Sequence, residues 1–478
     1  MKKALTRSAW ILLAFALVAV PHARAQVSLI AIGELDGSRA GSLADLSGLN
    51  YNLENGDPAN LLGGLGSAIC YASGNTFLAL PDRGPNAQPF DSNIDDTVSY
   101  INRFHTITMD LKPNTSGTGL PFTLTPTLRA TTLLWSLTPL VYGKGDTIVG
   151  SGAPRINNFF LHFFTGRSDN FDPNRNSGDP NDARFDSEGM RLSNDGLRVY
   201  ISDEYGPYVY EFDRLTGVRL RSFQLPSSFY VNTLSSMGAV EISGNTSGRV
   251  ANKGMEGLAI TPDGRTLVGI MQNALIQDAA EGGAAANVLR IVTIDIASGR
   301  VTHQFAYLLT TGSGVSEILA INNHEFLVDE RDGKGREANL PPDLSTKVTV
   351  NKSKLLYKID LDGAVDVTNM DGLGAAANAV PKTVFLDVAG VLIANGVPAD
   401  QVPSKIEGIA FGPDVKEGKT TVHTLWVGND NDFFLNVLDS NGKPILNPSQ
   451  FFVFSFTDAD LAGSQFVPQQ FRGFGFLW

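Results

Sequence analysis

The sequence predicts an all-β chain folded as a β-propeller of four-stranded blades. Three observations support this prediction: a motif that begins with Glu-Gly recurs, each copy holds a tight turn between two apolar runs, and a second hairpin usually follows. Two hairpins in series make a four-stranded sheet, and repeated four-stranded sheets are typical of propeller blades. The length allows five to seven blades, and we expect six.

The two clearest copies of the motif begin at Glu188-Gly189 and Glu256-Gly257. In both, an Asp-Gly turn lies 7 and 8 residues after the Glu, and a polar pair ends 16 to 17 residues after it. An apolar run, a glycine turn and a second apolar run predict an antiparallel hairpin. Weaker copies begin at Glu317 and Glu407. A fifth copy, from Ala68 to Leu80, lacks the acidic starting residue. The polar ends of the five copies are Asp82-Arg83, Asp203-Glu204, Gln272-Asn273, Glu330-Arg331 and Asn429-Asp430.

Both ends of the mature chain supply candidate strands for closing the ring. The runs from Val27 to Ile32 and from Phe451 to Phe456 are apolar or alternating, and we expect them to share one sheet. Residues 133–182 fit the repeat poorly, so we interpret them as a degenerate blade with a long loop. We therefore expect residues 26–478 to form a single propeller domain.

Residues 1–25 have the three parts of a secretory signal peptide. Lys2, Lys3 and Arg7 precede an apolar stretch of 12 residues, and Ala23-Arg24-Ala25 offers a cleavage site. The apolar stretch is shorter than the roughly 20 residues of a spanning helix. Removing the segment and its four basic residues takes the net charge from −12 to −16. We therefore expect a periplasmic or extracellular monomer that binds no nucleic acid and has no transmembrane segment.

A hairpin returns its two ends to the same edge of a blade, so the motif starts and the polar pairs should meet at one mouth of the channel. Carboxylates crowded at such a mouth repel each other unless a cation, a proton or an Arg compensates. Their oxygens suit Ca²⁺ or another hard divalent ion. The expected ligands are Glu188, Glu256, Glu317, Glu407, Asp82, Asn429 and Asp430. The alternative is that each Glu accepts backbone N–H bonds from the neighbouring blade.

Arginines near the same mouth are candidates for holding an anionic substrate, because a guanidinium binds phosphate or carboxylate with two parallel hydrogen bonds. They can equally form salt bridges with the acidic ring. A loop before Glu188 supplies two of these arginines. The substrate-binding candidates are Arg83, Arg331, Arg167, Arg184, Gln272 and Asn273.

Several of these segments resemble the bacterial phytase-like family that is described as having esterase-like activity. The resemblance rests on Arg184-Phe185-Asp186-x-Glu188-Gly189, Ser202-Asp203-Glu204-Tyr205-Gly206-Pro207, Met255-Glu256-Gly257-Leu258, Leu327-x-x-Glu330-Arg331-x-Gly333 and Ile406-Glu407-Gly408. It extends from about Ser47 to about Asp432. The resemblance implies an exported propeller that hydrolyses phosphoric or carboxylic esters.

The favoured hypothesis is a metal-assisted hydrolase acting on a small ester. In it the Glu ring holds Ca²⁺ and a carboxylate positions the attacking water. The catalytic candidates are Asp203, Glu204 and Glu330. A non-catalytic propeller that binds a ligand or partner through the same mouth is the alternative, and a lactonase-type calcium propeller is a third possibility. The sequence contains no Gly-x-Ser-x-Gly elbow and no His-Glu-x-x-His zinc motif.

Overall fold

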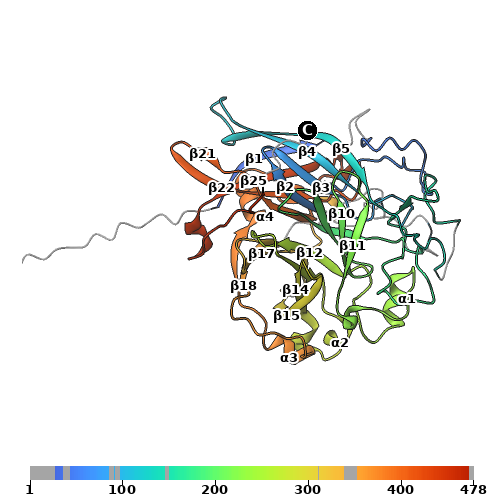
Figure 1. The fold of residues 1–478 in the computed structure, drawn as a ribbon. Coiled ribbons are helices and arrows are strands. Elements are labelled where there is room, and N and C mark those ends of the chain that lie inside the picture. Colours follow the sequence, from blue (N-terminus) through green and yellow to red (C-terminus); the bar gives the residue numbers. More distant parts are fainter. Residues whose placement is uncertain are drawn as a thin grey trace, which may run out of the picture.

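Five antiparallel sheets are arranged in a ring in the computed structural model (Figure 1). The structure describes residues 27–35, 44–85, 91, 97–145, 150–310, 312–338 and 353–472, so the expected signal peptide lies outside the described residues. Blade 1 consists of β2 (Ala68–Ser73), β3 (Thr76–Leu80), β4 (Arg103–Pro113) and β5 (Phe122–Leu133). Blade 2 consists of β8 (Ser187–Leu192), β9 (Arg198–Asp203), β10 (Tyr208–Asp213) and β11 (Arg219–Gln224).

The other three blades follow in chain order. Blade 3 consists of β12 (Met255–Ile260), β13 (Thr266–Met271), β14 (Val288–Asp295) and β15 (Arg300–Leu308). Blade 4 consists of β16 (Gly314–Ala320), β17 (Glu325–Arg331), β18 (Lys354–Asp360) and β19 (Lys382–Asp387). Blade 5 consists of β20 (Ile406–Phe411), β22 (Thr420–Asn429), β25 (Ser449–Phe456) and β1 (Ser28–Leu35), with β21 (Val415–Glu417) paired to β22.

The ring closes with five blades. The innermost strands β2, β8, β12, β16 and β20 each contact the next, and β20 contacts β2 again. Five lies within the expected range of five to seven but below the six that we expected. The difference arises in residues 133–182, where the described part forms no four-stranded sheet. Its only regular pairing there is a two-stranded sheet of β6 (Trp135–Ser136) and β7 (His162–Phe163).

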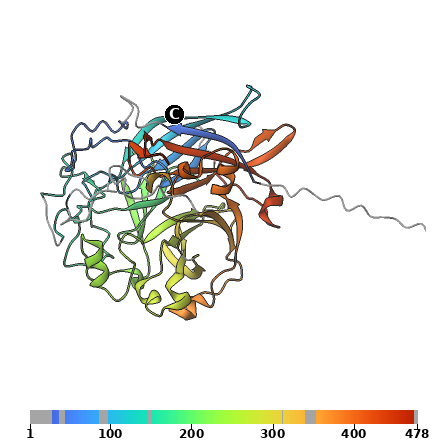
Figure 2. The same ribbon diagram turned by 180° about the vertical axis from the view of Figure 1, so that it is seen from behind.

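Blade 5 joins the two ends of the chain, as the sequence predicts. β1 pairs antiparallel with β25, from Ser28 opposite Ser455 to Leu35 opposite Ser449. In Figures 1 and 2 the blue N-terminal strand runs beside the red C-terminal strands. β1 is thus the outermost strand of a blade whose other strands come from the end of the chain.

Burial follows the position of a strand in its blade. Every residue of β12 is buried, because a central strand is covered on both faces by its neighbouring blades. The outer strand β5 alternates instead: Phe122 and Leu124 are buried, while Thr123 and Thr125 are exposed. Apolar clusters therefore fill the spaces between adjacent blades.

The remaining elements are short and lie in the connections. A second two-stranded sheet pairs β23 (Asn436–Leu438) with β24 (Pro444–Leu446). The α-helices are α1 (Gly238–Ser243), α2 (Ile276–Ala279), α3 (Gly372–Ala376) and α4 (Val388–Ala394). The 3₁₀ turns are Ser227–Phe229, Gly283–Asn287, Arg336–Ala338, Ala399–Gln401 and Asp458–Leu461. Within the described ranges no helix has the length and apolar character needed to cross a membrane.

Candidate functional site: an acidic mouth of the channel

In four of the blades, a β-bulge at the start of the innermost strand changes the direction of one side chain. In blade 3, Met255 pairs with Met271 and Gly257 with Ile270, which leaves Glu256 unpaired between them. Glu188 in β8 and Glu407 in β20 lie in the same kind of irregularity. Because bulges redirect side chains beside functional sites, these three Glu occupy equivalent places around one end of the channel, which we call the mouth.

The glycine after each of these Glu is required by close packing between blades. A Cβ on Gly189 would lie 2.5 Å from the backbone N of Leu258, and a Cβ on Gly257 would lie 2.8 Å from the backbone N of Ile318. Both distances are too short for any side chain. The recurring Glu-Gly pair thus combines a side chain for the mouth with a glycine that lets the next blade approach.

Glu317 does not occupy the place that we expected for it. In blade 4, Val315 pairs with Glu330 and Glu317 with Asp329, so the extra residue of the bulge is Ser316. A shift of one residue moves a strand side chain to the other face. Glu317 instead forms an ion pair with Arg191 at 3.0 Å and accepts the backbone N–H of Leu258 at 2.8 Å. This is the backbone-capping arrangement that the sequence left open.

Five carboxylates gather on one side of the mouth and form what we call the carboxylate cluster. They fall into two groups of three that share Glu188, and within each group one ligand oxygen per residue lies within 4.8 Å of the others. The groups are Asp82, Asp186 and Glu188, and Glu188, Glu204 and Glu256. Oxygens that each lie about 2.4 Å from one Ca²⁺ can be at most about 4.8 Å apart. The arrangement therefore fits a hard cation in either group.

Four residues of the cluster are buried and Glu188 is partly buried, and several of the cluster's oxygens have no hydrogen-bond partner. Asp186 Oδ1, Glu204 Oε1 and Glu256 Oε2 are in this state, in residues that are 1%, 1% and 2% exposed. Unsatisfied buried oxygens are costly unless an ion, a proton or water meets them. The donor set thus matches what a divalent cation requires.

Burial and mutual repulsion raise the pKa of four of these carboxyls, those of Asp82, Glu188, Glu204 and Glu256. Burial raises the pKa of Glu188 well above its usual value, and Glu256, Asp186 and Glu204 add to the effect. Burial also raises the pKa of Glu204 to about 7, with Asp186 as the next cause. Burial, with the charge of Glu204 as the next cause, also raises the pKa of Glu256 well above its usual value. Without a cation the cluster therefore retains protons near neutral pH.

The opposite side of the mouth carries basic residues that are paired with acids. Arg331 forms an ion pair with Glu407 and donates from Nε to Ser316 Oγ at 2.8 Å. Lys405 forms ion pairs with Asp430 and with Asp432, the latter at 2.8 Å. Two expected ligands, Glu407 and Asp430, are thus already neutralised by cationic side chains.

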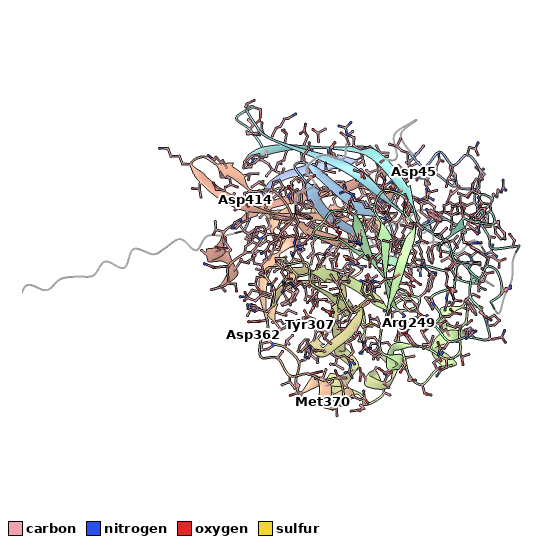
Figure 3. The ribbon with its side chains drawn as sticks, in the orientation of Figure 1. Asp45, Arg249, Tyr307, Asp362, Met370 and Asp414 are labelled. Carbon is pink, nitrogen blue, oxygen red and sulfur yellow. The ribbon has the colours of Figure 1, made fainter. Side chains whose placement is uncertain are left out.

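Three further candidates from the sequence lie outside the cluster. Glu330 lies between blades 3 and 4, where Tyr307 Oη of β15 donates to it at 2.5 Å and Lys382 of β19 forms an ion pair with it; Tyr307 is labelled in Figure 3. Asp203 accepts the backbone N–H groups of Asp186 at 3.1 Å and Tyr205 at 2.9 Å, so it shapes the turn after β9.

The third, Asn429 at the end of β22, donates to Glu337 in the Arg336–Ala338 turn at 3.0 Å. Its neighbour in sequence, Asp430, reaches the mouth, because successive side chains of a strand face opposite sides.

The arginine candidates have different surroundings. Arg83 forms an ion pair with Asp186 at 2.7 Å, directly beside the cluster. Arg167 binds Asp169 with two parallel hydrogen bonds of 2.6 and 2.9 Å and is 1% exposed, so it is part of the loop core. Arg184 lies over the rings of Phe171 and Tyr205.

Gln272 and Asn273 directly follow β13 and are partly buried. The register places Gln272 at the position of blade 3 that Glu204 occupies in blade 2, because Met271 pairs with Met255 as Asp203 pairs with Ser187.

Two residues of the mouth were not among the expected site residues. Asp186 joins Asp82 and Glu188 in the first group of the cluster, and Lys405 neutralises Asp430 across the mouth. The available signal was spacing: Asp186 and Lys405 each precede a motif Glu by two residues, and residues two apart in a strand face the same side.

A fungal protein of Arthroderma benhamiae, described as an uncharacterized secreted protein, is 31% identical over 215 residues, which is 37% of this chain and 42% of that protein. The match thus spans about two fifths of the relative.

Solved structures that resemble the chain do so weakly. The periplasmic gluconolactonase PpgL of Pseudomonas aeruginosa is 12% identical, with a TM-score of 0.32 over 89% of this chain and 99% of that one. The PQQ-bound aldose sugar dehydrogenase of Streptomyces coelicolor is 11% identical, with a TM-score of 0.32 over 90% and 94%. The model of the phytase-like family, described as esterase-like activity of phytase, matches residues 60–433, which include the whole carboxylate cluster, and the chain therefore belongs to that family.

Proposed function

We propose that this protein is an exported hydrolase of phosphoric or carboxylic esters whose carboxylate cluster holds a divalent cation, Ca²⁺ being the best fit. The observation that carries the proposal is the cluster itself, with ligand oxygens within 4.8 Å of one another in the mouth of a phytase-like propeller. Hard oxygen ligands favour Ca²⁺ over softer metals. Export is supported by the N-terminal segment and by the fungal relative described as secreted.

The residues of the mouth have distinct roles in this proposal. Asp82, Asp186 and Glu188 hold the cation, which when bound supplies a Lewis acid for the ester oxygen. Glu204, with its unpartnered Oε1, orients the attacking water and accepts its proton. Glu330 does not serve as this base, because Tyr307 and Lys382 hold it between blades 3 and 4.

The cationic side of the mouth favours an anionic ester. Lys405 faces three carboxylates, those of Glu407, Asp430 and Asp432, and an incoming phosphate or carboxylate can exchange with one of them. Charge-assisted hydrogen bonds to such a group are stronger than neutral ones.

Turnover with and without chelator tests the proposal. The purified mature protein is assayed on nitrophenyl phosphate, nitrophenyl acetate and phytate, in calcium and in EDTA. We expect hydrolysis of at least one ester and its loss in EDTA. No turnover of any of the three in calcium contradicts the proposal, and a tight complex with unchanged ester identifies a binding propeller instead.

A further inference from the structure

The C-terminal part of the chain crosses the end of the ring that lies opposite the mouth. The mouth lies where the innermost strands begin, and residues 466–472 run over the places where these strands end; we call this segment the strap. Three of its backbone N–H groups donate to carbonyl oxygens just beyond the ends of β16, β12 and β8: Val467 to Ile321 at 2.9 Å, Gln470 to Pro262 at 2.9 Å, and Arg472 to Asn194 at 2.7 Å. The strap is thus bonded to blades 4, 3 and 2.

Two aromatic side chains of the strap reach the remaining blades. The ring centre of Phe466 lies 4.5 Å from that of Phe411, the last residue of β20 in blade 5. The ring centre of Phe471 lies 6.0 Å from that of Tyr71 in β2 of blade 1. The strap therefore contacts all five blades at the ends opposite the mouth.

A cavity of about 90 Å³ lies beneath the strap. Five residues of the strap line it, together with Cys70 of β2 and Arg191 of β8 among others. Cys70 is the one cysteine of the sequence and is 4% exposed. A cavity of this size holds a few water molecules. The strap thus forms the outer wall that separates the Cys70 thiol from bulk water.

An ion pair crosses the centre of the ring between the carboxylate cluster and this cavity. Arg191 lies three residues beyond Glu188 along β8, which is roughly 10 Å deeper at the usual rise of a strand. It donates to the backbone O of Ile69 in blade 1 at 3.2 Å and of Ile318 in blade 4 at 2.8 Å. It also forms the ion pair with Glu317 at 3.0 Å. The cavity therefore lies on the far side of this ion pair from the cluster.

The carboxylate cluster takes its members from three blades. Asp82 follows β3 of blade 1, Glu188 belongs to β8 of blade 2, and Glu256 belongs to β12 of blade 3. The strap joins the same three blades at their opposite ends. We propose that the strap is a clamp that closes the far end of the ring and holds the blades at the spacing that the cluster requires. Its effect on cation binding rests on the proposed function, whereas the closure of the far end does not.

The Cys70 thiol reports whether the far end is closed. Burial raises its pKa to about 11, and only the thiolate reacts, so the folded parent should react slowly with dithionitrobenzoate at pH 8. Removing residues 466–478 should raise the labelling rate at least about tenfold, because it opens the cavity to solvent. The free energy of unfolding of each variant, measured in urea, gives the share of labelling that passes through the unfolded chain.

Two adjacent glutamines of the strap form a matched pair of point variants. Gln469 donates from Nε2 to the backbone O of Leu192 at 2.7 Å and to Asn194 Oδ1 at 2.8 Å. Gln470 is exposed and bonds to blade 3 through its backbone. Gln469→Ala should label faster than the parent, and Gln470→Ala should label like the parent. This pair decides the question if the truncated chain does not fold.

Calcium calorimetry on the same variants tests the clamp. The truncated chain should bind calcium at least about tenfold more weakly than the parent, because affinity depends on the rigidity of the ligand set. Gln469→Ala should also bind more weakly, and Gln470→Ala should bind like the parent. Two results overturn the inference: a parent whose thiol reacts as fast as that of the strap variants, or folded strap variants with unchanged calcium affinity. A parent that binds no calcium, but whose thiol becomes reactive in the strap variants, supports the closure and removes the proposed function instead.

Discussion

Replacing Glu204 with Gln tests whether the ionised, buried carboxyls of the cluster destabilise the folded protein. Burial raises the pKa of Glu204 from 4.5 to about 7, and the residue is 1% exposed. Because the folded pKa is the higher one, the stability from this group is fully present below about pH 4.5 and is lost as the pH rises through about 7. Raising the pKa by about 2.5, at 1.36 kcal/mol for each step of one in pKa, lowers the free energy of unfolding at high pH by about 3 kcal/mol.

The assay is urea unfolding in EDTA at pH 5 and pH 8. The metal-free parent should lose stability between these values, and Glu204→Gln should lose about 3 kcal/mol less, because the amide does not ionise. Calcium should restore the parent at pH 8, since a ligand that binds only the folded state stabilises it. Glu34→Gln, at an exposed position on β1, is the control and should follow the parent. An identical pH dependence in the parent and Glu204→Gln refutes the reasoning.

Three further predictions concern the ring and its closure. Glu256→Gln should weaken calcium binding at least about tenfold, or 1.4 kcal/mol, with calcium-free stability within about 1 kcal/mol of the parent; calorimetry and melting curves measure both, and equal calcium affinity contradicts the ligand role. Deletion from Phe451 onward should unfold the protein, because it removes β25 from between β22 and β1; a soluble fragment with a cooperative melt shows otherwise. Gly257→Ala should destabilise by about 2 kcal/mol or more, since the new Cβ would lie 2.8 Å from Ile318 N; an unchanged melting temperature would show that the blades can separate there.

The sequence predicted the parts of the fold that depend on local signals. Asp195-Gly196 and Asp263-Gly264 are turns because Gly196 and Gly264 have φ near +70°, which glycine adopts without strain. The closing strands were also predictable, because their apolar alternation is strong at both ends. The number of blades was not, since it depends on which long connections form a sheet, and residues 133–182 carry no periodic pattern that decides this.

The sequence predicted which motifs form the site, but it did not predict the register of the strands that carry them. Glu188, Glu204 and Glu256 were expected at one mouth, and the structure brings them together with Asp82. Glu317 was aligned by its acidic side chain, but the bulge in β16 falls one residue earlier. No local signal in a single sequence reveals where a bulge inserts its extra residue, so a shift of this kind is visible only in three dimensions.

The pairing of β1 with β25 also determines the order in which the blades can form. β1 ends at Leu35 and β25 begins at Ser449. β1 therefore cannot pair with β25 until almost all of the polypeptide has been synthesised. Blades 1 to 4 take all their strands from contiguous stretches and can form as the chain emerges. Contacts between such distant segments form slowly, because a long loop must close first. Until they do, the edge of β25 remains open and blade 5 is incomplete.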